Sequence, residues 1–309
     1  MDISDELHQA RLVTSIRVLL AGLGVVVLWA SAFPAIRVAT IEFGAIGLSV
    51  ARLVVAAVAL LVIAPFFRVR LPKLRDFTLI IVCGFFGMTA YQLLLNWGEL
   101  DVPAATASII VAAAPLVSIG IAAIAFKERL SPVRMFGSAV AIGGVVLVCL
   151  ARAGVSFSSA VWIVVGAMVV QGLYHPMTKP LLKKYSGLEV ATYTMVAGAL
   201  MTLPFIPLGW DAIASAGVAS WSAALYLGLF PSALGFVLWG YAVARLPVIT
   251  STAFMYLIPP VAVLIAFVWL GEAPMPTELV GGGIVIVGVM AISQGDRVAA
   301  RLRTRVAIG

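Results

Sequence analysis

The segments VPAATASIIVAAAPLVSIGIAAIAFKERLSP (102–132) and LPVITSTAFMYLIPPVAVLIAFVWLGEAPMP (246–276) align without gaps at a shift of 144 residues. The prolines Pro115 and Pro259 coincide in this alignment, and 11 of the 42 pairs that start from residues 103–144 are identical. Self-similarity at a fixed shift is the sequence signature of a repeated structural unit. The sequence therefore predicts an internal duplication.

Composition identifies the environment of this duplicated chain. It has 309 residues, of which 63% are hydrophobic and 11% charged, and its mean hydropathy is +1.14. A soluble domain of this length carries far more charge, so the chain is expected to be an integral membrane protein. A spanning helix needs about 20 mainly apolar residues. Segments of this kind are expected at 17–37, 45–66, 77–97, 103–126, 134–151, 158–178, 189–209, 218–241, 247–270 and 276–293.

Ten spans divide into five for each repeat, residues 1–152 and 153–309. Because five is odd, the second copy would enter the membrane upside down, as in many secondary transporters that bind substrate between their halves. The expected fold is all-α, with ten transmembrane helices as two inverted five-helix repeats around a central cavity. With the N-terminus inside, 17 of the 20 basic residues fall on the cytoplasmic side, which predicts that both termini are cytoplasmic.

Several motifs in the first half of the sequence are similar to those of a known family. WASAFPAIR (29–37), ARL (51–53), PLVS (115–118) and FKERLS (126–131) resemble the EamA-type drug/metabolite transporter superfamily, and within it most of all the bacterial aromatic amino-acid exporters. The resemblance implies a multi-pass protein of the bacterial inner membrane that exports amino acids or other small metabolites through a cavity between its halves. GLYHP (172–176) departs from the usual family pattern.

Polar residues inside spans are the candidates for substrate contact, because such side chains commonly face the bundle interior. Gln171, Tyr174 and His175 are spaced to share one helix face. His175 could bind a carboxylate or relay a proton, or it could be satisfied by a neighbouring carbonyl. Other candidates combine rings and a thioether for an apolar side chain with amides and hydroxyls for a charged end: Trp29, Phe33, Tyr91, Gln92, Ser232, Phe236, Trp239, Met255 and Tyr256. The aromatic members could instead belong to the belts that form at membrane interfaces.

Five prolines in the apolar runs are expected to mark helix breaks and hinges: Pro34, Pro115, Pro176, Pro231 and Pro259. Proline removes a backbone donor, so it produces either a functional bend or a packing kink. The glycine-rich faces 137–144 and 281–288 could pack on each other within the chain or form a dimer interface.

Charge inside the spans is limited to Arg52, which could cap carbonyls, extend toward the interface or bind a substrate carboxylate. No carboxylate falls in the middle of a span, and Glu99 and Glu272 are placed near the outer rim. We therefore expect no buried acid, which favours facilitated diffusion or coupling through His175 alone.

These features predict a secondary transporter that exports amino acids, aromatic or broadly neutral, or related small metabolites by alternating access, with uncoupled facilitated diffusion as one mode. The alternatives are a proton-coupled exporter of drug-like or other metabolites and a non-transporting membrane receptor or scaffold. The sequence contains no HExxH, GxSxG or Walker motif, so no enzymatic activity, metal or cofactor is expected. The expected partners are a small-molecule substrate and membrane lipid, not nucleic acid, with the chain as a monomer or homodimer.

Overall fold

Long apolar runs fold into helices throughout the described chain. The computed structural model describes residues 3–125, 132–153, 159–245 and 254–306, and within these ranges it contains no strand. Its α-helices are α1 (Ile3–Ile63), α2 (Phe77–Gly84), α3 (Tyr91–Gly98), α4 (Ala104–Val111), α5 (Ala114–Ala125), α6 (Pro132–Ala153), α7 (Ser159–Leu182), α8 (Gly187–Thr202), α9 (Ile206–Ser215), α10 (Val218–Leu227), α11 (Gly235–Val243), α13 (Ile258–Leu270) and α14 (Pro276–Val306). Short 3₁₀ turns lie at Leu74–Asp76 and Leu203–Phe205.

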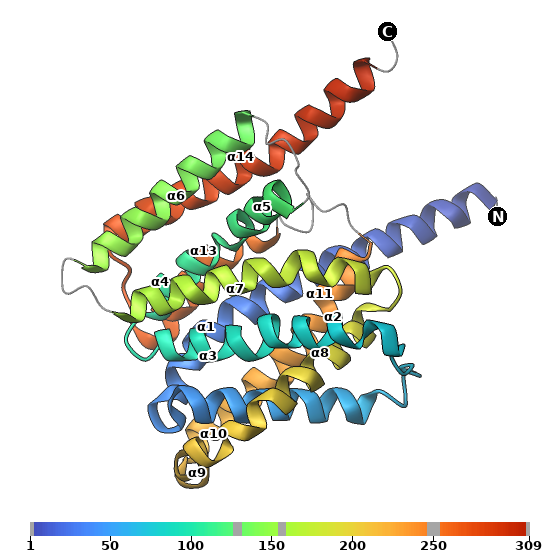
Figure 1. Cartoon of the computed structure of the whole chain (residues 1–309). Coiled ribbons are helices and arrows are strands. Elements are labelled where there is room, and N and C mark those ends of the chain that lie inside the picture. The colour runs from blue at the N-terminus through green and yellow to red at the C-terminus, as the bar shows by residue number, and fades with distance from the viewer. Residues whose placement is uncertain (1–2, 126–131, 154–158, 246–253, 307–309) are drawn as a thin grey trace.

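The first of these helices is really two. Gly44 has φ 59° and ψ −175° inside α1, a left-handed backbone that glycine adopts without steric cost. The chain turns back at this point, so residues 3–43 and 45–63 run as two separate helices (Figure 1). The apolar part of α1, Ile16–Ile63, has 48 residues. A straight helix of that length would extend about 72 Å, more than twice the hydrocarbon core of a bilayer.

Five helical segments in the described residues are long and apolar enough to cross a membrane. They are Ile16–Ile63, Leu74–Gly98, Ser159–Leu182, Gly187–Ser215 and Val218–Val243. Shorter apolar helices lie at Ala104–Ser118, Met135–Val148, Ile258–Leu270 and Pro276–Ala291. The all-helical membrane fold is thus as expected, whereas the division into ten separate spans stays a prediction.

Two of the expected breaks occur where the prolines predict them. The helix ends at Val111 and restarts at Ala114, directly before Pro115. In the second copy α13 starts at Ile258, directly before Pro259. Ala114 and Ile258 are 144 residues apart, which is the shift found in the sequence.

The expectation of breaks at Pro34 and Pro176 is wrong, because α1 and α7 continue through these residues. A proline removes one intrahelical hydrogen bond, and the neighbouring bonds together with tight packing can keep the helix continuous. Pro34 is buried, as are the neighbouring residues Ala30, Ala32 and Ala35 of the same helix.

Two stretches adopt π-helical geometry, Phe85–Ala90 and Gly228–Leu234. The second contains Pro231, so this proline lies in a widened helical turn and not at a break. The α-helix resumes at Tyr91 in one copy and at Gly235 in the other, again 144 residues apart. Short π-helical insertions are frequent at functional sites, and these two flank the cavity described below.

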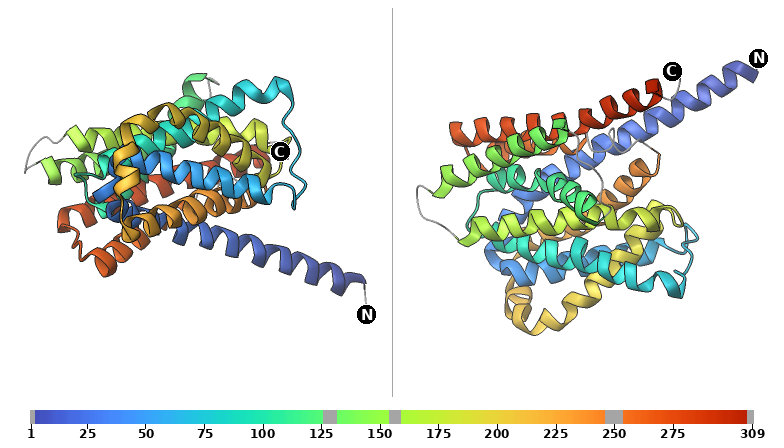
Figure 2. Two further views of the ribbon diagram at one scale, coloured as in Figure 1. Left: turned by 90° about the horizontal axis from the view of Figure 1, so that it is seen from below. Right: turned by 45° about the horizontal axis from the view of Figure 1, so that its top comes forward.

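The two glycine-rich faces pack on each other within one chain, as one of the two interpretations predicted. Helices α6 and α14 lie side by side (Figures 1 and 2). A Cβ added to Gly144 would lie 2.7 Å from the backbone nitrogen of Val285 and 2.8 Å from the carbonyl oxygen of Gly281. Glycine is therefore required for this close approach.

Buried side chains form two clusters that meet at Trp29. One cluster joins the first part of α1 to α4, α10 and α13, and the other joins the second part of α1 to α2 and α8. Trp29 packs against both. Trp29 therefore lies at the boundary between the two clusters.

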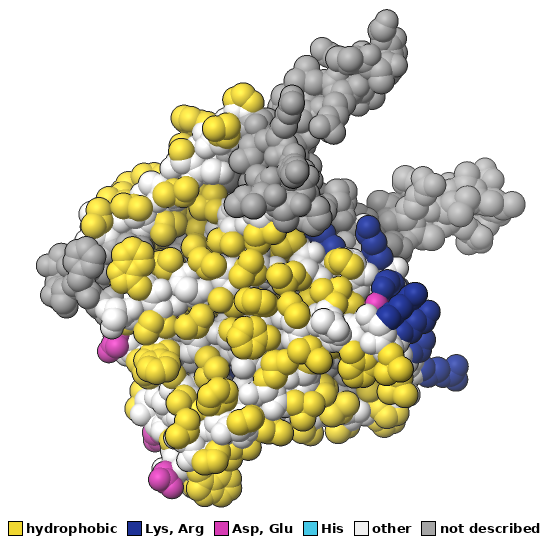
Figure 3. Space-filling view, viewed as in Figure 1, with side chains coloured by type: hydrophobic (Ala, Val, Ile, Leu, Met, Phe, Trp, Pro, Cys, Tyr) yellow, Lys and Arg dark blue, Asp and Glu magenta, His cyan; other side chains and the backbone are white. Residues whose placement is uncertain are grey.

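The surface has a broad apolar area with charge at its ends (Figure 3). One end exposes the basic residues Arg68, Arg70, Lys73, Arg75, Lys179, Lys183, Lys184 and Arg245. The acids Glu42 in α1, Asp101 in the turn after α3 and Asp211 in α9 are exposed, and Figure 3 shows acidic side chains on the edge opposite the basic one. A protein with an apolar belt around its middle and charged ends is suited to a bilayer.

Candidate substrate cavity

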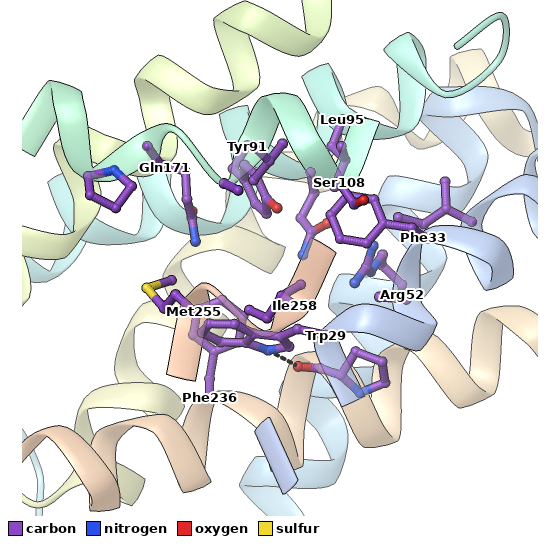
Figure 4. A pocket seen from close by; sticks show the side chains of 18 residues that line it. Trp29, Phe33, Arg52, Tyr91, Leu95, Ser108, Gln171, Phe236, Met255 and Ile258 are labelled. Atoms are coloured by element: carbon purple, nitrogen blue, oxygen red, sulfur yellow. Dashed lines mark hydrogen bonds between the residues drawn. The ribbon is translucent and has the colours of Figure 1, made fainter. Parts of the chain in front are cut away.

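A cavity of about 60 Å³ lies where α1, α3, α4, α7 and α11 converge. Figure 4 shows its side chains projecting inward from these helices. It is lined by Trp29, Ala32, Phe33, Ile36, Arg52, Tyr91, Gln92, Leu95, Ser108, Val111, Ala112, Ala114, Pro115, Gln171, Pro231, Phe236, Met255 and Ile258. This volume holds a few water molecules but is well below the roughly 300–1,000 Å³ of typical ligand pockets. The described conformation is therefore nearly closed.

Arg52 is the charged group of this lining. Its side chain is 3% exposed, and its Nε and Nη2 atoms donate to Ser232 Oγ at 3.2 and 3.1 Å. Nη1 donates to Asn96 Oδ1 at 3.5 Å, and Asn96 is held in turn by its own bond to Ser49 Oγ at 2.8 Å. In the described residues no carboxylate lies within ion-pair distance of the Arg52 guanidinium. A buried cation held only by neutral groups favours an anionic ligand.

Two amide oxygens in the lining have no partner. Gln92 Oε1 and Gln171 Oε1 are buried, and neither forms a hydrogen bond with any described residue. Gln171 points from α7 into the cavity (Figure 4). Buried polar atoms in folded proteins are nearly always paired, so an orphaned pair of acceptors in a cavity indicates a missing donor. An ammonium group is such a donor.

The remaining wall is apolar and aromatic. The rings of Trp29 and Phe236 have centroids 5.2 Å apart, and Trp29 Nε1 donates to the Pro231 carbonyl oxygen at 3.1 Å. This bond, drawn in Figure 4, fixes the indole against the second π-helical segment. Phe33, Met255 and Ile258 complete the wall. An apolar side chain of a ligand would find its complement here.

Most candidates named from the sequence line this cavity: Trp29, Phe33, Arg52, Tyr91, Gln92, Pro115, Gln171, Pro231, Phe236 and Met255. The others lie behind the wall. Ser232 accepts from Arg52, and Trp239 packs against Trp29 in a tilted arrangement with ring centroids 5.5 Å apart. Tyr256 is buried and donates to the Val289 carbonyl oxygen at 3.3 Å. That any of these residues contacts a substrate stays a prediction.

Tyr174 and His175 share the face of Gln171, but neither lines the cavity. Tyr174 is buried against Gly87 in the first π-helical segment. The His175 ring lies between Tyr174 and Trp239, with centroid distances of 5.7 and 5.9 Å. The cavity contacts only part of this face of α7. Gln171 lines the cavity, whereas Tyr174 and His175 do not.

Small residues of the lining were missed by reasoning from the sequence. Ser108, Ala112 and Ala114 surround the break between α4 and α5, and their side chains carry little chemistry to distinguish them. Their proximity to Pro115 is the signal that could have found them, because a broken helix widens the space beside it.

The expectation that the chain buries no acid is wrong. Glu99 and Glu278 are both fully buried. Glu99 follows the end of α3, where Arg37 covers it by donating to the Glu99 and Leu100 carbonyl oxygens at 2.6 and 2.8 Å. Arg37 also forms an ion pair of 3.4 Å with Glu272. Residues at a helix end can be covered by side chains of a neighbouring helix, here Arg37 of α1, which hydropathy along the chain does not reveal.

A few polar side chains inside an otherwise apolar cavity of a helical membrane protein are typical of transporters that bind small molecules. Residues 16–150 and 158–294 each match the EamA-like transporter family. The chain belongs to this family, as its sequence motifs predicted, and the family domain is duplicated within it.

Relatives agree with this assignment. The chain is 53% identical over 269 residues to the "Probable terminal-alkyne amino-acid exporter" of Streptantibioticus cattleyicolor, covering 87% of this chain and 91% of that protein. It is 30% identical over 263 residues to the transporter YdfC of Bacillus subtilis, covering 85% of this chain and 86% of that one. A crystal structure at 19% identity superposes with a TM-score of 0.64, covering 89% of this chain and 95% of the other. This last likeness concerns the fold alone.

Proposed function

We propose that this protein is a secondary exporter of neutral amino acids with apolar side chains, aromatic ones included. One observation carries the proposal: the cavity places the guanidinium of Arg52, which has no described carboxylate at ion-pair distance, together with two unpartnered amide oxygens, Gln92 and Gln171. A carboxylate needs donors and an ammonium needs acceptors. A zwitterion supplies both groups, and the aromatic wall accepts its side chain.

The contacts follow from this chemistry. The substrate carboxylate binds the Arg52 guanidinium, which Asn96 and Ser232 hold in position. The ammonium donates to the orphaned oxygens of Gln92 and Gln171. The side chain of the substrate lies against Trp29, Phe33, Phe236 and Met255. The similarity to a protein named as an amino-acid exporter supports this substrate class, and its terminal-alkyne substrate would add slim apolar side chains to it.

Transport by alternating access requires two halves that can move against each other. We assign these halves to residues 1–152 and 153–309, as inverted repeats of five spans each. The shift of 144 residues supports the assignment, because it relates the helix starts at Ala114 and Ile258 and those at Tyr91 and Gly235. The breaks before Pro115 and Pro259 and the two π-helical segments are the points at which the halves bend.

The basic end of the molecule is assigned to the cytoplasm, with both termini on that side of a bacterial inner membrane. The support is the positive-inside rule applied to the exposed Lys and Arg residues of the loops. The cavity would then open alternately to this end and to the end that carries the Arg37–Glu272 ion pair.

A second candidate function is the export of drug-like or other metabolites without a zwitterionic group. The observation that favours it is the large apolar share of the lining, which could hold many flat ring systems. Arg52 would then have a structural role only. The two candidates differ in whether both charged groups of the ligand are needed.

Counterflow in proteoliposomes tests the proposal. Vesicles preloaded with unlabelled phenylalanine are given labelled phenylalanine, methionine, threonine or propargylglycine outside. We expect transient accumulation of the apolar amino acids. N-acetylphenylalanine and phenylalanine methyl ester, each lacking one charge, should compete weakly. No accumulation by folded protein would refute amino-acid transport, and equal competition by the blocked analogues would favour the second candidate.

A further inference from the structure

Glu99 is a buried acid that the proposed substrate contacts do not use. It directly follows the span Leu74–Gly98, and its side chain is fully buried. Neither carboxyl oxygen forms a hydrogen bond with any described residue. An ionised carboxylate buried without donors is far more costly than the neutral acid. Glu99 is thus poised to change its protonation state when the charges around it change.

Its position connects it to the cavity. Gln92, Asn96 and Glu99 follow one another at i, i+4 and i+7, so they share one face along the end of α3. At 1.5 Å per residue, Glu99 lies about 4.5 Å further along the helix axis than Asn96 and about 10 Å further than Gln92. Asn96, which accepts from the Arg52 guanidinium, is therefore nearer to Glu99 along α3 than Gln92 is.

The charged groups that face Glu99 are Arg37 and Arg52 from α1 and Glu272 from the turn between α13 and α14. Burial raises the pKa of Glu99 well above its ordinary value, and the two guanidiniums oppose this without cancelling it. Glu272 adds to the rise but is itself paired with Arg37. Arg52 is the one of these groups that lines the cavity.

We propose that Glu99 is a proton-binding site linked to the occupancy of Arg52, so that an amino acid and a proton bind together. The proposal rests on the function proposed above. When the substrate carboxylate binds Arg52, its negative charge offsets the guanidinium that favoured ionised Glu99. At a pH between the pKa of Glu99 in the empty carrier and its higher pKa in the loaded one, the Glu99 carboxylate then takes one proton from the water of the open side and becomes a neutral acid. The loaded carrier therefore holds one more proton than the empty one.

The sign of the linkage follows from the proposed positions of the two substrate charges along α3. The substrate ammonium would favour the ionised form of Glu99, but it lies toward Gln92 and Gln171, further from Glu99 along α3 than the substrate carboxylate. The carboxylate therefore dominates. Because linkage is reciprocal, substrate affinity must fall as pH rises. The fall is at most about tenfold per pH unit, and it occurs only between the pKa of Glu99 in the empty carrier and its higher pKa in the loaded one.

The test is calorimetric binding of phenylalanine to the whole purified protein in two buffers that differ in ionisation enthalpy. The measurement is repeated over a series of pH values, and between the two pKa values of Glu99 we expect net proton uptake on binding, up to one proton for each phenylalanine. In Glu99→Gln, which mimics the neutral acid, we expect binding without proton uptake and an affinity that does not change with pH. Glu272→Gln is the matched control, because it removes the neighbouring acid, and it should keep the uptake.

The possible outcomes separate this inference from the proposed function. Failure of the wild-type protein to bind phenylalanine would refute the function and the linkage with it. Binding without proton uptake at every pH of the series, or uptake that persists in Glu99→Gln, would overturn the linkage and leave the function standing. If Glu99→Gln does not fold, infrared difference spectra of the wild-type protein decide. A new carboxylic acid band on phenylalanine binding supports the inference, and its absence overturns it.

Discussion

The Arg52 guanidinium and the Ser232 hydroxyl are joined by two hydrogen bonds, of 3.2 and 3.1 Å, across 180 residues of sequence. The first residue belongs to the second part of α1, and the second to the π-helical segment Gly228–Leu234. The pair of bonds therefore connects the two copies of the repeated family domain at the cavity wall. A ligand that bound Arg52 would act on both copies at once.

Replacing Arg52 by Gln should abolish most transport. The substrate carboxylate would lose a charge-assisted hydrogen bond, which contributes about 1.5–3 kcal/mol, so the KM for phenylalanine should rise about ten- to a hundredfold. Counterflow measured over a range of substrate concentrations checks this result. Lys183→Gln removes an exposed cation at the basic end and should leave the KM unchanged. An unchanged KM in Arg52→Gln would assign Arg52 a structural role.

Replacing Gln171 by Leu should impair the recognition of the substrate ammonium while keeping the volume of the side chain. Losing this acceptor should weaken phenylalanine binding about tenfold. N-acetylphenylalanine has no ammonium, so its weak competition should not change. A comparison of the two inhibition constants in counterflow checks the prediction. An equal loss for both ligands would mean that Gln171 shapes the cavity without binding the ammonium.

Two adjacent glycines of α6 should respond in opposite ways to Ala. In Gly144→Ala the new Cβ would clash with the backbone of α14, so the Tm in detergent should fall by several degrees. A Cβ on Gly143 would meet nothing within 4 Å, and Gly143→Ala should raise stability by about 0.5–1 kcal/mol, since alanine favours a helix. Thermal unfolding of both variants checks the pair. Equal shifts would contradict intramolecular packing of α6 on α14.

Replacing Trp29 by Phe should keep a ring in the wall but lose the bond to the Pro231 carbonyl oxygen. We expect a loss of about 1 kcal/mol of stability and slower counterflow, because the indole no longer fixes the second π-helical segment. Trp162 is 60% exposed on the outer surface of α7, and Trp162→Phe is the control. Similar effects in the two variants would show that the bond has no special role.

The sequence predicted residues that line the cavity better than it predicted the contacts around the cavity. Trp29, Gln92 and Gln171 could be identified because polar or aromatic residues inside an apolar run must have a protein environment. The breaks before Pro115 and Pro259 could be identified because proline lacks a donor and recurs at the same shift.

The rest depends on contacts between distant segments. Helix α1 continues through Pro34 because of how its neighbours pack, which local sequence does not record. Glu99 is buried because Arg37 folds over the end of α3, although both residues lie near the ends of apolar runs. His175 was assigned to the cavity from helical spacing, which gives a direction around α7 but not the width of the space beside it.

The π-helical segment Phe85–Ala90 determines how this part of the chain responds to the deletion of one residue. A π-helical turn contains about one residue more than an α-helical turn. Deleting one residue there would restore an ordinary α-helix and leave the residues beyond it at nearly the same rotation, because the π-helical turn already absorbs the extra residue. Tyr91 and Gln92 would then stay in the cavity wall. An equal deletion in a plain α-helical stretch would instead turn every residue beyond it by about 100°, so this segment is where the loss of one residue disturbs the cavity least.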